Sequence, residues 1–96
     1  MRYGFYLPTR GPLGNPDDIT EIAQAGEALG YATIVFGDHI VFPVTVASPY
    51  PYTVDGGFPG VGDAMEQLTL MSFVAGFTTT VRLVASVMIL PHRNPL

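Results

Sequence analysis

The residues of this chain best suited to chemistry are an aspartate and a histidine that are adjacent in the sequence. Gly37, Asp38 and His39 directly follow the apolar run 31–36, which is rich in β-branched residues and which we expect to be a buried strand. Carboxylates and imidazoles bind polar ligands and exchange protons. In α/β sheets and barrels, ligands bind at the carboxyl ends of the strands, where this pair would lie. Position alone leaves a second interpretation open, in which Asp38 caps the loop and His39 is a partly buried loop residue.

A serine interrupts the most apolar stretch of the chain, residues 83–90. This stretch is far shorter than the roughly 20 apolar residues that cross a bilayer, so we interpret it as a buried strand. From residue types alone, Ser86 is expected to donate its hydroxyl hydrogen to a neighbouring carbonyl oxygen.

Several other chemistries are excluded by what the sequence lacks. The chain has no cysteine, which excludes disulfides, thiol catalysis and thiolate metal sites. It has no lysine, which excludes a Walker loop. The turn at residues 9–14, which follows the apolar run at residues 3–7, lacks the Gly-x-Gly-x-x-Gly spacing of dinucleotide-binding folds. His39 and His92 are far apart in the sequence, so zinc-ligand spacing is absent and no metal site is expected.

The charge balance limits the partners that we expect. Eight acidic residues stand against four basic ones, and the formal net charge is -4. Proteins that bind nucleic acid or an anionic membrane surface usually present a basic face, which this chain cannot form. No stretch has the apolar length and the cleavage site of a signal peptide. We therefore expect a soluble, cytoplasmic protein that binds a small-molecule substrate, with no nucleic-acid partner and no membrane partner.

Strand and helix patterns alternate along the chain. Asn15 and Pro16 form a typical helix start, because Asn can cap free N–H groups and Pro suits the first helical position. Apolar residues then recur at helical spacing up to Gly30, which suits a left-handed helix end. The full expectation is strands near residues 2–8, 31–37 and 81–90, and helices near residues 16–29 and 64–78.

The long connection and the second helix carry two further expectations. Residues 37–63 exceed the usual length of a strand-to-helix loop, and their aromatic content (Phe42, Tyr50, Tyr52, Phe58) favours an ordered lid over a linker. In the second helix we expect the apolar face to consist of Met65, Leu68, Met71 or Ser72, Ala75 and Phe77.

This alternation predicts an α/β fold with a parallel sheet. The sheet is either an open, doubly wound sheet or part of a closed (β/α)8 barrel. The apolar runs at residues 3–7 and 31–36 are both nearly continuous, as in a parallel sheet covered on both faces. A full barrel needs about 250 residues, so this chain would supply three β/α units of an incomplete barrel. Asn94 and Pro95 repeat the helix-start pattern at the very end of the sequence, from which we expect a truncated chain.

Several segments resemble one protein family. YGFYLP at residues 3–8, ALGYA at 28–32 and GDHIV at 37–41 resemble the opening of luciferase-like flavin and deazaflavin oxidoreductases. YPYT followed by GGFP within residues 50–59, and VRL followed by LPHRNP within residues 81–95, are similar to the deazaflavin (coenzyme F420) class of that family. These motifs occur in the family's order and cover nearly the whole chain. Residues 1–96 are thereby identified as the N-terminal part of a luciferase-like domain.

The resemblance implies a (β/α)8 barrel whose cofactor ring lies across the carboxyl ends of the strands. It places Asp38 and His39 beside the ring, with His39 as proton donor or hydrogen-bond partner. It also implies a cis peptide bond between Ser86 and Val87, in a bulge that supports the back of the ring. Many flavin-using relatives carry glycine near this position, so Ser86 favours F420 over FMN.

The implied activity is hydride transfer between F420 and a small organic substrate, with an FMN-dependent monooxygenase that uses oxygen as the alternative. Strands four to eight of a barrel are absent from the sequence, so the chain alone is expected to be inactive. A non-catalytic fragment or interaction module is the remaining alternative. An open sheet face would then pair with another copy of the chain or with the missing C-terminal half of the barrel.

Overall fold

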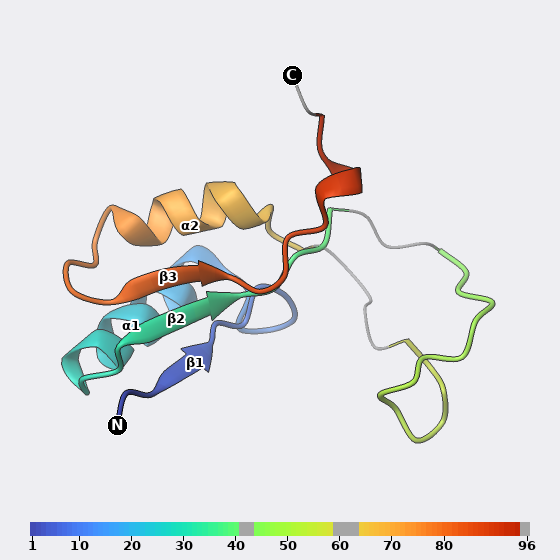
Figure 1. Cartoon of the computed structure of the whole chain (residues 1–96), viewed down its shortest axis with the longest axis horizontal. Coiled ribbons are helices and arrows are strands. Elements are labelled where there is room, and N and C mark those ends of the chain that lie inside the picture. The colour runs from blue at the N-terminus through green and yellow to red at the C-terminus, as the bar shows by residue number, and fades with distance from the viewer. Residues whose placement is uncertain (41–43, 59–63, 95–96) are drawn as a thin grey trace.

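The computed structural model describes residues 1–40, 44–58 and 64–94 and confirms the predicted alternation of strands and helices (Figure 1). The elements in chain order are β1 (Gly4–Tyr6), α1 (Pro16–Ala28), β2 (Thr33–Phe36), α2 (Gln67–Ala75), β3 (Arg82–Ala85) and the 3-10 helix η1 (Leu90–His92). The helix predicted to begin at Pro95 lies outside the described residues.

The three strands form one parallel sheet in the order β1-β2-β3, which confirms the α/β prediction. Phe5 lies opposite Ile34, and Val35 lies opposite Val84. All three strands point the same way, so their carboxyl ends meet at one edge of the sheet (Figure 1). This open, three-stranded arrangement is that of one part of a β/α barrel.

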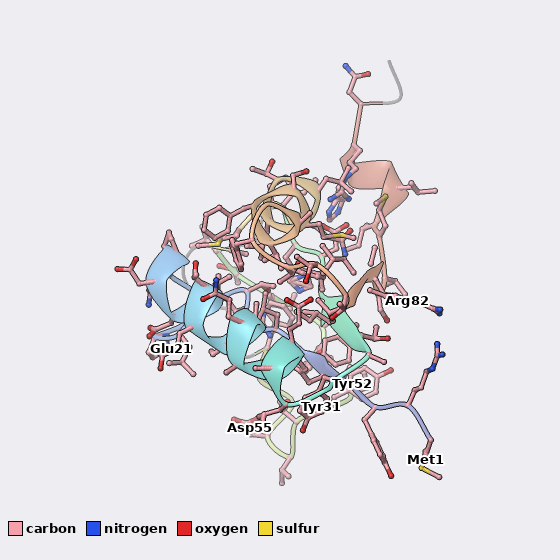
Figure 2. All side chains as sticks on the ribbon, turned by 90° about the vertical axis from the view of Figure 1, so that its left-hand side faces the viewer. Met1, Glu21, Tyr31, Tyr52, Asp55 and Arg82 are labelled. Atoms are coloured by element: carbon pink, nitrogen blue, oxygen red, sulfur yellow. The ribbon has the colours of Figure 1, made fainter. Side chains whose placement is uncertain are left out.

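The core lies between the sheet and the two helices, which cover the same face of the sheet (Figure 2). It consists of Leu7, Ile19, Ala23, Ile34, Phe36, Leu70 and Val74. On the other face, Tyr6 and Val84 are 64% and 40% exposed. The expectation of a sheet covered on both faces is therefore wrong for the described part of the chain.

Helix α1 starts and ends close to its prediction. The Asn15 side chain accepts a hydrogen bond from the Asp18 backbone N–H (3.0 Å), and Pro16 occupies the first turn. Gly26 faces β1 so closely that an added Cβ would lie 2.4 Å from a ring carbon of Phe5. Gly30 then adopts the expected positive φ of 85°.

Helix α2 is shorter than predicted and presents a different face. It starts at Gln67, because the Glu66 side chain caps it by accepting the Thr69 N–H at 2.7 Å. Its buried residues are Gln67, Leu70 and Val74, whereas Leu68 is 44% exposed. The predicted face through Leu68 and Ala75 is therefore wrong by part of a turn.

Strand β3 is the largest correction to the predicted boundaries. The apolar stretch continues to Leu90, but the strand ends at Ala85, and a cis peptide bond joins Ser86 to Val87. The chain then leaves the sheet and forms η1. No helix in the described ranges is long and apolar enough to cross a bilayer.

Candidate functional site

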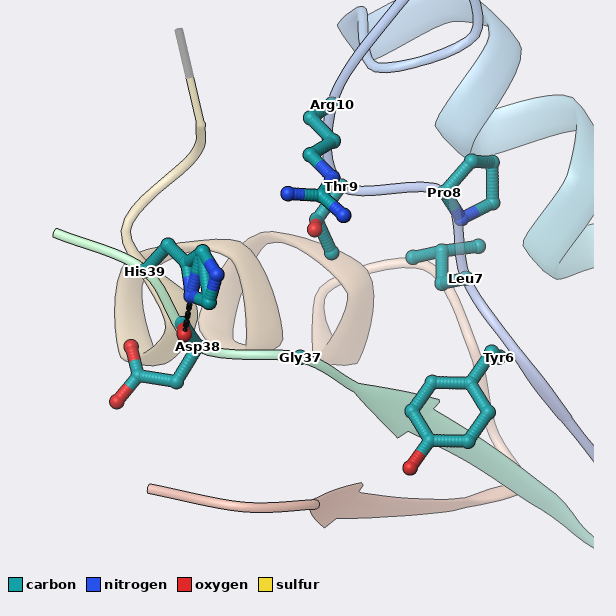
Figure 3. Close-up of a pocket in the computed structure, with 8 residues that line it drawn as sticks. All are labelled: Tyr6, Leu7, Pro8, Thr9, Arg10, Gly37, Asp38 and His39. Atoms are coloured by element: carbon teal, nitrogen blue, oxygen red, sulfur yellow. Dashed lines mark hydrogen bonds between the residues drawn. The ribbon is translucent and has the colours of Figure 1, made fainter. Parts of the chain in front are cut away.

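A cavity of about 420 Å³ opens at the carboxyl ends of β1 and β2 (Figure 3). Its walls are the end of β1 with the loop that follows and the first residues after β2: Tyr6, Leu7, Pro8, Thr9, Arg10, Gly37, Asp38 and His39. Two of the four residues predicted from sequence, Asp38 and His39, thus line one cavity, with Pro8 and Thr9 beside them.

The Asp38 side chain is buried, and its carboxylate is fully engaged. Oδ2 accepts the Ile89 backbone N–H at 2.6 Å and a bond from Arg93 Nη1, while Oδ1 accepts Arg93 Nη2 at 2.9 Å. The Arg93 guanidinium holds the pKa of Asp38 below its usual value, although burial acts in the opposite direction. Figure 3 shows this carboxylate pointing away from Thr9 and Arg10. Asp38 is therefore an ionised partner of Arg93.

Arg93 also connects this site to the start of α2. Its Nη2 lies 2.8 Å from Glu66 Oε1, so one guanidinium group binds two carboxylates. Burial opposes the ionisation of Glu66, but hydrogen bonds from the Thr69 N–H and from Arg93 lower its pKa to about 2. The pKa of Arg93 is raised, first by its bonds to Asp38 and then by its bond to Glu66.

His39 is partly buried at the rim of the cavity. Its Nδ1 contacts the backbone oxygen of Asp38, and its ring stacks on Phe58 with a centroid distance of 5.9 Å. Burial and the nearby charge of Arg10 lower the pKa of His39, while the Asp38 charge raises it. The imidazole is therefore mostly neutral near pH 7. Because a carbonyl oxygen only accepts, this contact is a hydrogen bond in the tautomer that carries its hydrogen on Nδ1.

Ser86 and Val87 lie at the end of β3, at the same edge of the sheet. The Ser86 hydroxyl bonds to the Tyr6 hydroxyl at 3.0 Å, not to a neighbouring carbonyl oxygen as expected. The Tyr6 hydroxyl also donates to the Ser86 backbone oxygen at 3.3 Å. Tyr6 lines the cavity, so it links Ser86 to the same site, whereas Val87 is 72% exposed and does not line the cavity.

The whole chain, residues 1–96, matches the family model of luciferase-like monooxygenases. The chain belongs to this family. Its curated relatives include one uncharacterized protein of Mycobacterium bovis and two of Mycobacterium tuberculosis strains. Each is 36% identical over 76 residues, which cover 77% of this chain and 26% of the relative. The luciferase-like chain thus spans about a quarter of the length of these relatives. No solved structure matches it.

Two residues that bind the strand ends beside this cavity were missed by sequence reasoning, Arg93 and Gln67. Arg93 follows the third strand as Asp38 follows the second, so the meeting of parallel strand ends could have paired them. Gln67 is fully buried and donates Nε2 to two backbone oxygens, those of Phe36 (2.9 Å) and Val87 (3.2 Å). The signal for Gln67 is a polar residue at a buried position of α2, but the apolar face predicted from the sequence does not include this position. Across the described ranges, His, Asp and Glu side chains form no group of three or more suited to a metal ion.

Proposed function

We propose that this chain forms part of the site of a luciferase-like oxidoreductase that uses F420 for hydride transfer to or from a small organic substrate. Membership of the family supports an oxidoreductase or monooxygenase that uses a flavin or F420. The observation that carries the finer proposal is the position of His39 at the rim of the cavity, beside the buried Asp38–Arg93 pair.

The residues present fit a flat, partly polar ring. The Val87 side chain is largely exposed at the edge of the sheet, and Tyr6 presents an exposed aromatic ring on the open face. His39 offers a polar group at the rim of the same edge. Apolar surface with a few converging polar groups is the usual character of a cofactor site. The residues proposed to surround the ring are thus His39, with Asp38 behind it, on one side and Ser86 and Val87 on the other.

When bound, F420 would supply a hydride donor or acceptor that reacts poorly with oxygen. The part of this chain is to position groups and to handle a proton. In the tautomer that carries its hydrogen on Nδ1, and with a lowered pKa, His39 would accept a proton at Nε2 and return it near neutral pH. Asp38 acts on His39 through its backbone oxygen and its charge, since its carboxylate is bound to Arg93.

A second candidate is an FMN-dependent monooxygenase, which the description of the family itself favours. The two candidates differ in the ring that they bind and in the use of oxygen. Ser86 supports F420, because many flavin-using relatives carry glycine near this position.

The deciding experiment is a titration with F420 and, separately, with FMN. The protein to use is a chimera in which this chain replaces the segment that it matches in the mycobacterial relative. We expect F420 to bind with a Kd below about 10 µM, equivalent to about 7 kcal/mol. His39→Asn should weaken the effect of pH on turnover relative to the unchanged chimera. Tighter binding of FMN with oxygen consumption would support the monooxygenase instead.

The 96-residue chain alone is expected to show no measurable oxidoreductase activity. A barrel cofactor site is built from loops after several strands, and catalysis depends on placement to within about an ångström. Submicromolar to low-micromolar binding of either cofactor by the chain alone would contradict this expectation and would show that three strands suffice.

A further inference from the structure

Beyond the Ser86 N–H, the backbone of residues 86–89 is not paired within the sheet. β3 ends at Ala85, and the last backbone bond to β2 runs from the Ser86 N–H to the Phe36 oxygen at 2.9 Å. Backbone N–H and C=O groups that leave a sheet need other partners, because an unpaired polar group near the core is costly.

The Met88 and Ile89 oxygens accept the backbone N–H groups of Leu90 (3.1 Å) and His92 (3.0 Å), and side chains from three separate parts of the fold serve three other groups. Tyr6 of β1 donates its hydroxyl hydrogen to the Ser86 oxygen at 3.3 Å. Gln67 of α2 donates Nε2 to the Val87 oxygen at 3.2 Å. Asp38, just after β2, accepts the Ile89 N–H at 2.6 Å. The segment is thus held from the open face of the sheet, from the helix-covered face and from the end of the neighbouring strand.

Gln67 is the least expected of the three side chains. It is 0% exposed, and its Oε1 is buried without a hydrogen-bond partner among the described residues. An apolar side chain of similar length would avoid the cost of burying that oxygen. Its Nε2, however, bridges the Phe36 and Val87 oxygens, which belong to two different strand ends. The Gln67 amide therefore binds two backbone oxygens beside the cavity, at the cost of one buried oxygen without a hydrogen bond.

We propose that Gln67, together with Tyr6, is a positioning residue that fixes the backbone of residues 86–89 at the edge of the cavity. The inference rests on the proposed function where it concerns the cofactor, because residues 86 and 87 are the proposed ring support. The other part of the inference, that the Gln67 and Tyr6 side chains hold this backbone, applies to the chain without any cofactor.

The first measurement is amide hydrogen exchange on the full 96-residue chain. In Gln67→Met, we expect the Ser86 and Ile89 N–H groups to exchange on the order of tenfold faster, with only a small change of the thermal midpoint, because the substitution removes an unpartnered buried oxygen as well as two hydrogen bonds. Gln24→Met is the matched control, because Gln24 is exposed on α1. Tyr6→Phe removes one exposed hydroxyl without risk to the core and should raise exchange at the same groups. Unchanged exchange in both variants would overturn the proposal.

The second measurement is F420 binding by the chimera described above. Gln67→Met should weaken binding about tenfold, equivalent to 1.4 kcal/mol, and shift the absorption maximum of the bound ring, whereas Gln24→Met should change neither. Equal affinity and an unchanged spectrum in Gln67→Met would show that the segment does not position the ring, and would overturn that part of the proposal. If the unchanged chimera binds neither F420 nor FMN, the proposed function fails, while the exchange rates of the free chain still decide whether Gln67 and Tyr6 hold the backbone.

Discussion

The two ends of β3 are each held by one carboxylate from elsewhere in the chain, but the two carboxylates are held in different ways. At the amino end, Glu27 of α1 accepts the backbone N–H groups of Thr79 (2.8 Å), Thr80 (2.5 Å) and Val81 (3.0 Å). At the carboxyl end, Asp38 accepts one backbone N–H, that of Ile89, and pairs with the Arg93 guanidinium.

The difference follows from exposure to solvent. Glu27 is partly exposed, and backbone donors led by the Thr80 N–H are sufficient to lower its pKa to about 2. Asp38 is only 6% exposed, so its charge requires a positive partner. A carboxylate that serves folding alone can thus remain near solvent with neutral donors. A buried carboxylate at the cavity edge brings a counter-ion with it, and the ion pair then links neighbouring segments.

The largest expected effect is that of Asp38→Asn. It leaves the Arg93 guanidinium without its main partner and should destabilise the chain by about 2 kcal/mol. This is less than the loss of a fully enclosed pair because the network lies near solvent at one side. The thermal midpoint should fall by about 10 °C. Asp17→Asn, at an exposed first-turn position of α1, should cost less than about 1 kcal/mol. Equal effects of the two variants would contradict the difference between exposed and buried carboxylates.

A smaller loss is expected for Glu27→Gln. The amide still offers one oxygen to the turn before β3, and water can reach the N–H groups that it releases. We expect the thermal midpoint to fall by only a few degrees, measured by circular dichroism. A fall as large as that of Asp38→Asn would show that exposure does not distinguish the two ends of β3.

The acid sensitivity of the chain should depend on the same carboxylate. The folded-state pKa of Glu27 is lowered from 4.5 to about 2, so its stabilising effect is complete above pH 4.5 and is lost as the pH falls towards 2. In Glu27→Gln, urea midpoints should therefore fall less steeply across this pH range than in the unchanged chain. A residual slope should remain, because the pKa values of Asp38 and Glu66 are also lowered.

The smallest expected effect is on the pKa of His39. Burial and Arg10 lower this pKa, and the charge of Asp38 partly opposes them. Asp38→Asn should therefore lower the His39 pKa further, whereas Glu27→Gln should leave it unchanged. An NMR titration of the His39 imidazole Hε1 proton in each variant measures this pKa. A rise of the His39 pKa in Asp38→Asn would contradict the assigned direction.

Local sequence patterns predicted most of the scaffold. Alternating apolar runs gave the three strands and their parallel order, and Asn15 with Pro16 gave the start of α1. The end of β3 could not be predicted in this way, because the residues after Ala85 are as apolar as those before it. What ends the strand is a set of side-chain bonds from distant residues, and these bonds do not appear in any local window.

The candidate site also has a part that the sequence predicts and a part that it does not. The position of Asp38 and His39 at a strand end followed from the fold rule, and the structure places both on one cavity. Their functional roles stay predictions. The partners of Asp38 depend on Arg93, which is distant in sequence, and on a turn that leaves the sheet. Gln67 was missed for a simpler reason, since the assumed face of α2 placed it among the polar positions.

Arg93 has a further consequence for the long connection between β2 and α2. One guanidinium holds Asp38, near the start of this connection, and Glu66, near its end. The two entry points are thus fixed by the scaffold itself, whatever lies between them. Doubling the length of a loop between fixed ends adds only about 0.6 kcal/mol of closure entropy. Insertions or deletions within residues 44–57 that keep His39 and Phe58 should therefore change the free energy of unfolding little, while the sheet and both helices keep their geometry.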